Sequence, residues 1–212
     1  MPLEPTVKRA YVFVDGQNLF YGVREAFGYP FPNYDVKALA QRVCSTEGWQ
    51  FAKVCFYTGY PTAMDNAFWN HFWDAKLAQM GREGVSTFSR PLRYRNQTVR
   101  LPDGSTTAIP VAQEKGIDVR LALDVIACAH QHVFDVAVLF SQDQDLSEVA
   151  DELRRIAQTQ GRWIKAVSAF PVSPTSRNRR GINGTDWIKI ERATYDGCVD
   201  PRDYRPKPKT AP

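Results

Sequence analysis

Four aspartates stand where an α/β protein presents side chains to a ligand. Asp15 ends an apolar, strand-like run, Asp118 opens a helix-like segment, and Asp143 and Asp145 follow a second apolar run. The carboxyl ends of parallel strands border the binding crevice of such a sheet, so we expect the four side chains to converge. Converging carboxylates raise each other's pKa unless a positive charge lies between them. The pattern therefore predicts a divalent cation site.

Each of these residues also has a purely structural interpretation. Asp118 and Asp145 lie at helix starts, where the helix dipole stabilises a carboxylate, and Asp143 fits this interpretation less well. Asn18, one turn into the helix after Asp15, can hold a ligand water or a carboxylate oxygen, or it can simply steady the turn. The recurrence of acidic residues at one edge favours the metal site.

The chemistry that fits this site is hydrolysis of a phosphodiester. Mg²⁺ and Mn²⁺ prefer oxygen ligands and keep several waters, so three or four carboxylates suffice for one or two ions. Such ions activate a water and stabilise the leaving oxygen. The sequence has no GxSxG elbow and no glycine-rich phosphate loop with its lysine. A covalent nucleophile and the use of nucleoside triphosphates are therefore not indicated.

Basic residues are grouped along the chain in a way that suits a polyanionic partner. Lysine and arginine total 27 against 23 acidic residues, which gives a formal charge of +4. A mild positive charge favours nucleic acid without demonstrating it. Any one of these side chains can instead simply solvate a loop. The candidate nucleic-acid contacts are Lys115, Arg90, Arg93, Arg95, Arg177, Arg179 and Arg180.

Several aromatic residues lie near the same predicted edge. Phe20, Tyr21, Tyr57 and Tyr60 follow or end the first two strand-like runs and offer stacking surfaces for unpaired bases. The aromatic run at 67–80 has helical spacing, and we interpret it as a packing face rather than a base platform.

Other classes of protein are not supported. The four cysteines are widely spaced without a CxxC pair, so neither a zinc site nor a disulfide framework is indicated. The chain contains no apolar stretch of membrane-spanning length, and its first residues lack a secretory signal. We expect a soluble, cytoplasmic protein without a membrane partner.

The elements that must position the aspartates alternate between strand and helix. This alternation predicts a three-layer α/β fold with a mostly parallel central sheet. Alternating residues around the Asp103–Gly104 turn signal predict a β-hairpin that projects from the sheet. We divide the chain into a lead at 1–9, one domain at 10–198 with the hairpin insertion at about 90–111, and a Pro- and Lys-rich tail at 199–212 that we expect to be mobile.

The residues that end strands and open helices also carry a family resemblance. The segments are, in order, YVFVDGQNLFYGVREAF, VCFYTGY, EKGIDVRLALDVI, VLFSQDQDLSEVADELR and RGINGTDWIKIERATYD. Together they resemble the NYN domain family, in the LabA-like branch of the PIN-like nucleases. The resemblance implies a PIN-like Rossmannoid fold, an acidic site for Mg²⁺ or Mn²⁺, and endoribonuclease activity.

The resemblance also assigns roles by position. Asp15, Asp118 and Asp143 correspond to metal ligands, Asp145 assists, and Asn18 accompanies the first aspartate. Asp124 matches the family pattern as a supporting residue, almost two helical turns beyond Asp118. Relatives often have SGDSDF where this chain has SQDQDL, so the geometry of that turn is the open point.

Three functions remain in competition. The first is a metal-dependent nuclease, with RNA preferred over DNA because of the family alone. The second is a non-catalytic, nucleic-acid-binding regulatory module whose acidic pocket holds a metal. The third is a phosphatase for a small phosphate ester. The hairpin and the helix expected at 62–80 are candidate surfaces for a homodimer.

Overall fold

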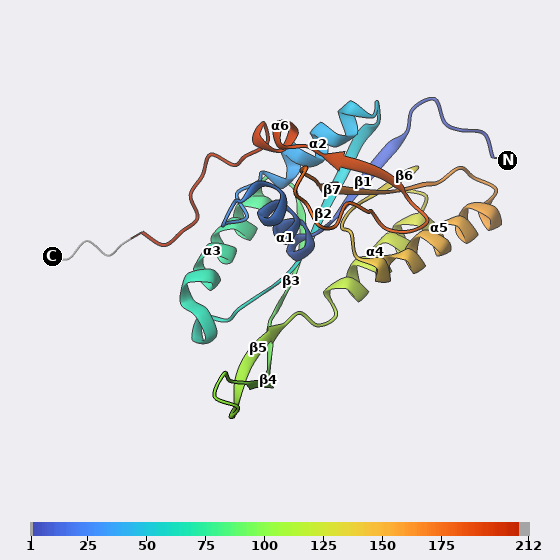
Figure 1. Ribbon diagram of the computed structural model, residues 1–212. Coiled ribbons are helices and arrows are strands. Elements are labelled where there is room, and N and C mark those ends of the chain that lie inside the picture. Colours follow the sequence, from blue (N-terminus) through green and yellow to red (C-terminus); the bar gives the residue numbers. More distant parts are fainter. Residues whose placement is uncertain (1, 208–212) are drawn as a thin grey trace.

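The computed structural model describes residues 2–207 and shows a sheet with helices on both faces (Figure 1). The alternation of strand and helix expected from the sequence is present in most of the chain. In chain order the elements are β1 (Arg9–Asp15), α1 (Gly16–Phe27), α2 (Val36–Thr46), β2 (Gln50–Tyr60), α3 (Ala63–Arg82), β3 (Ser86–Pro91), β4 (Arg93–Arg100), β5 (Thr106–Gln113), α4 (Ile117–His130), β6 (Val136–Phe140), the short 3-10 helix η1 (Gln144–Leu146), α5 (Ser147–Gln160), β7 (Lys165–Pro171), β8 (Asp186–Ile190) and α6 (Arg192–Asp196).

The central sheet has six strands in the order β3-β2-β1-β6-β7-β8, and every neighbouring pair is parallel. The chain first builds outward from β1 to β2 and β3, and then returns to place β6 on the other side of β1. The direction of winding therefore changes between β1 and β6. In open parallel sheets, the crevice at such a point, beyond the carboxyl ends of the strands, is where ligands bind.

Burial on both faces explains the continuous apolar strands. Along β1, Val12 and Val14 pack into the core shared with α1, α2 and α3. Phe13, between them, packs into the core shared with α4 and α5. Because successive side chains of a strand point to opposite faces, a strand covered on both faces must be apolar at every position. This arrangement confirms the predicted three-layer architecture.

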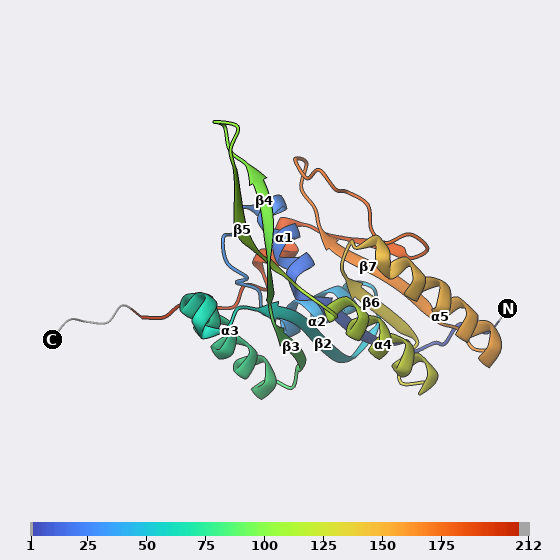
Figure 2. The ribbon, with the colours of Figure 1, turned by 90° about the horizontal axis from the view of Figure 1, so that it is seen from below.

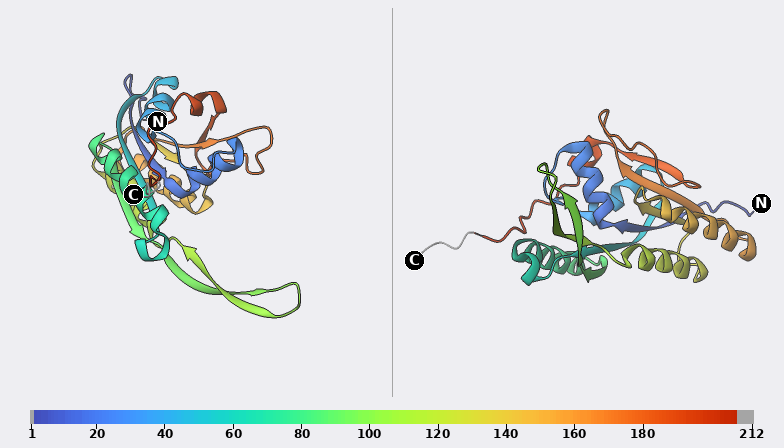
Figure 3. Two further views of the ribbon diagram at one scale, coloured as in Figure 1. Left: turned by 90° about the vertical axis from the view of Figure 1, so that its left-hand side faces the viewer. Right: turned by 60° about the horizontal axis from the view of Figure 1, so that its bottom comes forward.

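The predicted hairpin is also present. β4 and β5 form an antiparallel pair in full register from Arg93↔Gln113 to Arg100↔Thr106, and the pair extends away from the sheet (Figure 3). At its tip, Gly104 has a positive φ of 87°, a conformation that glycine adopts without steric cost. The Asp103 carboxylate accepts hydrogen bonds from the backbone and hydroxyl of Ser105, which closes the turn.

The segment after α6 differs from the mobile tail that we expected. Asp200 is buried and lies 3.7 Å from the Lys76 ammonium of α3. Arg202 pairs with Asp200 at 2.7 Å and also with Glu83. These contacts attach the chain to α3 up to this point, whereas residues 208–212 of the tail lie outside the described part. No helix within residues 2–207 is both long and apolar enough to cross a membrane.

Candidate active site

Asp15 lies at the point where β1 passes directly into α1. Its side chain is 4% exposed; one oxygen accepts a hydrogen bond of 3.0 Å from the Asn18 backbone and so caps α1. The other oxygen accepts a hydrogen bond of 3.1 Å from the Ser141 hydroxyl, at the end of β6. Gly16 permits this abrupt turn, because a Cβ there would lie 2.5 Å from the Phe56 ring.

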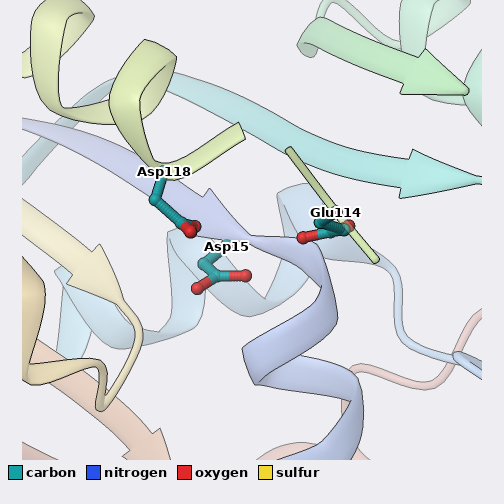
Figure 4. A group of neighbouring side chains, drawn as sticks. All are labelled: Asp15, Glu114 and Asp118. Atoms are coloured by element: carbon teal, nitrogen blue, oxygen red, sulfur yellow. The ribbon is translucent and has the colours of Figure 1, made fainter. Parts of the chain in front are cut away.

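Three carboxylates meet at this edge. Asp15, Glu114 and Asp118 each offer one oxygen, and the three oxygens lie within 4.8 Å of one another. Figure 4 shows the three side chains gathered where β1 ends. Asp15 comes from β1, Glu114 follows β5 at the root of the hairpin, and Asp118 lies in the first turn of α4. We call Asp15, Glu114 and Asp118 the acidic trio.

The electrostatic environment of the trio disfavours three negative charges without a cation. Burial, together with the charges of Asp118 and Asp143, raises the pKa of Asp15 to about 6. Burial, together with Asp15 and Asp118, raises the pKa of Glu114 to about 7. The pKa of Asp118 is also raised, first by burial and then by Asp143 and Asp145. Such mutual repulsion is relieved when a cation binds between the carboxylates.

The two aspartates predicted after β6, Asp143 and Asp145, differ in their position relative to the site. Asp143 lines the same cavity of about 420 Å³ as the trio, and its carboxylate caps η1 by accepting a hydrogen bond of 3.0 Å from the Asp145 backbone. Asp143 thus reaches the cavity without joining the trio. Asp145 is exposed, and among the described residues it does not line this cavity.

Asn18 also lines the cavity. Its side-chain oxygen accepts a hydrogen bond of 3.0 Å from the Gln142 backbone, which connects α1 to the turn after β6. The side-chain amide of Gln142 in turn donates a hydrogen bond of 2.9 Å to the Arg180 backbone carbonyl. The SQDQDL turn therefore holds the loop between β7 and β8 against the site.

The predicted basic residues lie on two projections around the cavity rather than in it. Arg93 and Arg95 belong to β4, with Arg90 just before them at the end of β3, and all three are exposed. A loop between β7 and β8 carries the exposed residues Arg177, Arg179 and Arg180. Figure 2 shows the hairpin and this loop projecting in the same direction, on either side of α1.

Lys115 and Arg90 lie close to the start of α4. Lys115 is exposed and directly follows Glu114. The guanidinium of Arg90 comes so near that a Cβ on Gly116 would lie 2.7 Å from it. Gly116 precedes Ile117, the first residue of α4, by one position. Lys115 is thus next to Glu114 in the chain and Arg90 lies beside Gly116 in space, and neither of them lines the cavity of the trio.

Asp124, which the resemblance gives as a supporting residue, lies away from the trio. Asp124 accepts a hydrogen bond of 2.9 Å from the Tyr57 hydroxyl and pairs with Arg120 at 2.9 Å, so it joins α4 to β2.

Of the aromatic residues proposed for stacking, Tyr57 is buried and the Tyr60 hydroxyl donates a hydrogen bond to Asp74. Phe20 and Tyr21 line cavities at the site edge.

Sequence reasoning missed Glu114 and Ser141. Glu114 is neither at the end of a sheet strand nor at a helix start, and it reaches the trio because the hairpin returns the chain there. Its carboxylate accepts a hydrogen bond from the backbone of Gly59 at the end of β2. One signal was available: Glu114 precedes Asp118 by four residues, across the glycine at 116 that opens α4.

The donor set fits a hard divalent cation. The trio offers carboxylate oxygens, the ligands that Mg²⁺ and Mn²⁺ prefer. Among the described residues, the lining of the cavity consists of Asp15, Gln17, Asn18, Tyr21, Ala112, Gln113, Glu114, Asp118 and Asp143. None of these side chains carries a positive charge that could neutralise the carboxylates. The trio would hold the ion, and Asp143 lines the same cavity.

Comparison with known proteins adds a family and a fold. The family model described as NYN domain matches residues 9–161, while no curated protein shows a significant match. A solved structure of a protein of unknown function from Vibrio parahaemolyticus has 20% identity and a TM-score of 0.54, over 90% of this chain and 97% of that chain; this shows the fold alone. MurG from Acinetobacter baumannii, with 11% identity over 86% of this chain and 45% of its own, has a TM-score of 0.33 and supports no conclusion.

Proposed function

The chain belongs to the NYN domain family, and from this premise we propose that it is a metal-dependent endoribonuclease. NYN domains are in general PIN-like nucleases, so a nuclease is the function that the family implies. The observation that carries the proposal is the acidic trio, at the carboxyl edge of the parallel sheet. The preference for RNA rests on the family alone, and the assignment to the LabA-like branch rests on the resemblance of the sequence motifs.

The side chains of the site have separable roles in this proposal. When bound, Mg²⁺ or Mn²⁺ supplies the positive charge that activates a water and stabilises the leaving oxygen of a phosphodiester. Asp15, Glu114 and Asp118 would hold the ion, and Asp143, which lines the same cavity, would support it.

The charges around the site support a nucleic-acid substrate. The exposed arginines of the hairpin and of the loop between β7 and β8 stand on both sides of an acidic cavity. Arginine binds phosphates through its planar fork of donors, so these side chains would hold the backbone of a strand while one phosphate approaches the trio. Asp145, which is exposed beside Asp143, would assist through its charge.

Cleavage of labelled single-stranded RNA and DNA, with Mg²⁺, Mn²⁺ or chelator, tests the proposal. We expect metal-dependent cleavage of RNA by the wild type and a loss of at least 100-fold in Asp118→Asn, with RNA binding retained. Asp151→Asn is the matched control, because Asp151 is an exposed carboxylate on α5.

Three other outcomes would contradict the proposal. RNA binding without cleavage under any metal condition would favour the regulatory binding module. Turnover of a small phosphate ester without an effect on polynucleotides would favour the phosphatase. Full activity of Asp118→Asn would remove the trio from the mechanism.

A further inference from the structure

A second cavity adjoins the acidic one. It has a volume of about 320 Å³ and lies between α1, α3 and the root of the hairpin. Gln17, Tyr21 and Ala112 line both cavities, so the two cavities adjoin, and we call them together the groove. We propose that this second cavity binds an unpaired nucleobase whose own or neighbouring phosphate lies at the acidic trio. This inference rests on the proposed function, because it names a substrate subsite of the same groove.

The lining of the second cavity suits a neutral aromatic ring. Its aromatic side chains are Phe20, Tyr21, Trp69, Trp73 and Tyr94. None of the described residues that line it is charged, in contrast to the acidic cavity beside it. A phosphate would lack a cationic partner here, whereas a base can stack on aromatic rings. The two cavities thus match the two chemical halves of a nucleotide.

A break in α3 shapes the wall of the cavity. Asn66 has extended dihedral angles (φ −158°, ψ 95°) inside the helix, and its side-chain oxygen accepts a hydrogen bond of 3.1 Å from the Trp69 backbone. Asn66 therefore restarts the helix, and both Asn66 and Trp69 line the cavity. The packing face expected from the sequence is present in Phe72 and Trp73, which are buried, but Trp69 is shared with the groove.

Polar groups in the lining can read the edge of a base. The Gln17 amide offers donors and an acceptor, and the Asn66 amide, whose oxygen accepts from the Trp69 backbone, offers its two N–H donors. Bases in single strands are recognised by such hydrogen bonds in combination with stacking, since their edges are not paired. A double-stranded substrate would keep its bases stacked inside the helix, so the cavity selects for single-stranded or looped regions.

The hairpin places the two halves of the groove side by side. Tyr94 pairs with Ala112 across the two strands, and both residues line the aromatic cavity. Glu114, two residues beyond Ala112, belongs to the trio; two residues of extended chain span about 7 Å. Arg93 and Arg95 alternate with Tyr94 along β4, so they point to the opposite face of the hairpin. That face of the hairpin remains available for the sugar-phosphate backbone of the RNA.

Tyr94 is the residue on which to test the subsite. It is 40% exposed on the hairpin, so its replacement leaves the core of the domain intact. We expect Tyr94→Ala to weaken binding of a short single-stranded RNA about 10-fold, and Tyr94→Trp to restore it, because stacking needs only an aromatic face. Ile109→Ala is the matched control, since Ile109 is 43% exposed on the same hairpin and lies outside the groove lining.

Binding is measured in chelator, without catalysis, so that the proposed subsite and the proposed nuclease activity can be contradicted independently. Trp69 and Trp73 line the cavity, and we expect intrinsic tryptophan fluorescence to be quenched when the RNA is titrated in chelator. An abasic nucleotide at the position next to the cleaved bond should remove the difference between the wild type and Tyr94→Ala. Trp69→Leu provides a second variant, which removes the aromatic face and keeps an apolar side chain against Phe31 and Phe72.

The results separate the two ideas. Quenching that depends on Tyr94, with no cleavage under any condition, would retain the subsite and overturn the nuclease. Cleavage by the wild type with equal affinity and equal KM in Tyr94→Ala, Trp69→Leu and Ile109→Ala would overturn the subsite and retain the nuclease. A melting curve of each variant, recorded by circular dichroism, shows that an effect is not due to unfolding.

Discussion

At the scale of single residues, the site consists of carboxyl groups that the fold holds under mutual repulsion. Asp15 is buried at the end of β1, and Glu114 and Asp118 lie within reach of the same ion. Their raised pKa values mean that folding brings charge together at a cost, which a bound cation would offset. Stability and ion binding at this site should therefore depend on pH in opposite ways.

The first prediction concerns Asp15 in the ion-free protein. Its pKa is about 6 in the folded chain and 3.8 in the reference state, so the unfolded chain loses this proton at the lower pH. The free energy of unfolding should fall as pH rises from about 4 to about 6. Asp15→Asn removes that loss, and at pH 8 in chelator the variant should be more stable by about 3 kcal/mol.

Urea denaturation of both proteins at pH 4 and pH 8 measures this effect. At pH 4 the difference between the wild type and Asp15→Asn should nearly vanish. The exposed carboxylate of Asp151 gives the control, Asp151→Asn, which should change stability equally little at both pH values. A pH-independent effect of Asp15→Asn would contradict the proposed origin of the pKa shift.

At the scale of elements, the turn from β1 into α1 has little room. A Cβ on Gly16 would lie 2.5 Å from the Phe56 ring and 2.9 Å from the Tyr57 carbonyl oxygen. Because Asp15 both ends the strand and caps the helix, any shift of this turn also moves the carboxylate. The local backbone and the site are therefore coupled.

The second prediction follows from this crowding. Gly16→Ala should lower the free energy of unfolding by about 1–3 kcal/mol, because β2 must move to admit the methyl group. The control is Gly81→Ala in α3, where no atom lies within 4 Å of the added Cβ; alanine there should be neutral or slightly stabilising. Thermal denaturation of both variants measures this effect. Equal melting temperatures of Gly16→Ala and Gly81→Ala would show that the turn relaxes freely.

The third prediction concerns the hairpin as an arm that contacts phosphates. Arg95 is exposed on β4. Arg95→Gln should weaken binding to all RNA sequences alike and reduce the slope of log affinity against log salt by about 1. Arg155→Gln, at an exposed position on α5, should leave the slope unchanged. Fluorescence anisotropy at several salt concentrations tests both variants; an unchanged slope for Arg95→Gln would exclude a phosphate contact.

At this scale the sequence predicts most of the architecture. Continuous apolar runs located the buried strands, and the Asp103–Gly104 signal located the hairpin, because both patterns are local. Glu114 could not be found in this way: its position depends on where the hairpin returns and on the hydrogen bond from Gly59. The break at Asn66 is equally a product of the fold, since the helical spacing of the residues at 62–80 predicts an uninterrupted helix.

At the scale of the whole molecule, the segment after α6 packs against α3. Lys76 is buried in α3, and its ammonium donates a hydrogen bond of 2.8 Å to the Tyr34 carbonyl and lies 3.7 Å from Asp200. Burial lowers the pKa of Lys76 to about 8. The segment therefore supplies the charge that keeps a buried ammonium paired at neutral pH.

The fourth prediction concerns this pair. Asp200→Asn should lower the free energy of unfolding by about 3 kcal/mol, because it leaves the Lys76 charge buried without its partner. Adding Lys76→Met to Asp200→Asn should recover much of that loss, since no buried charge then remains. Urea denaturation at pH 7 measures both; if the double variant is less stable than Asp200→Asn alone, the ammonium is not the source of the effect.

The position of Glu114 has a consequence for regulation. Two members of the trio, Asp15 and Asp118, belong to the central body, whereas Glu114 is carried by the root of an arm that extends into solvent (Figure 3). Any macromolecule that displaces the arm must change the affinity of the trio for a cation. Thermodynamic reciprocity then requires that the cation change the affinity for that macromolecule by the same factor.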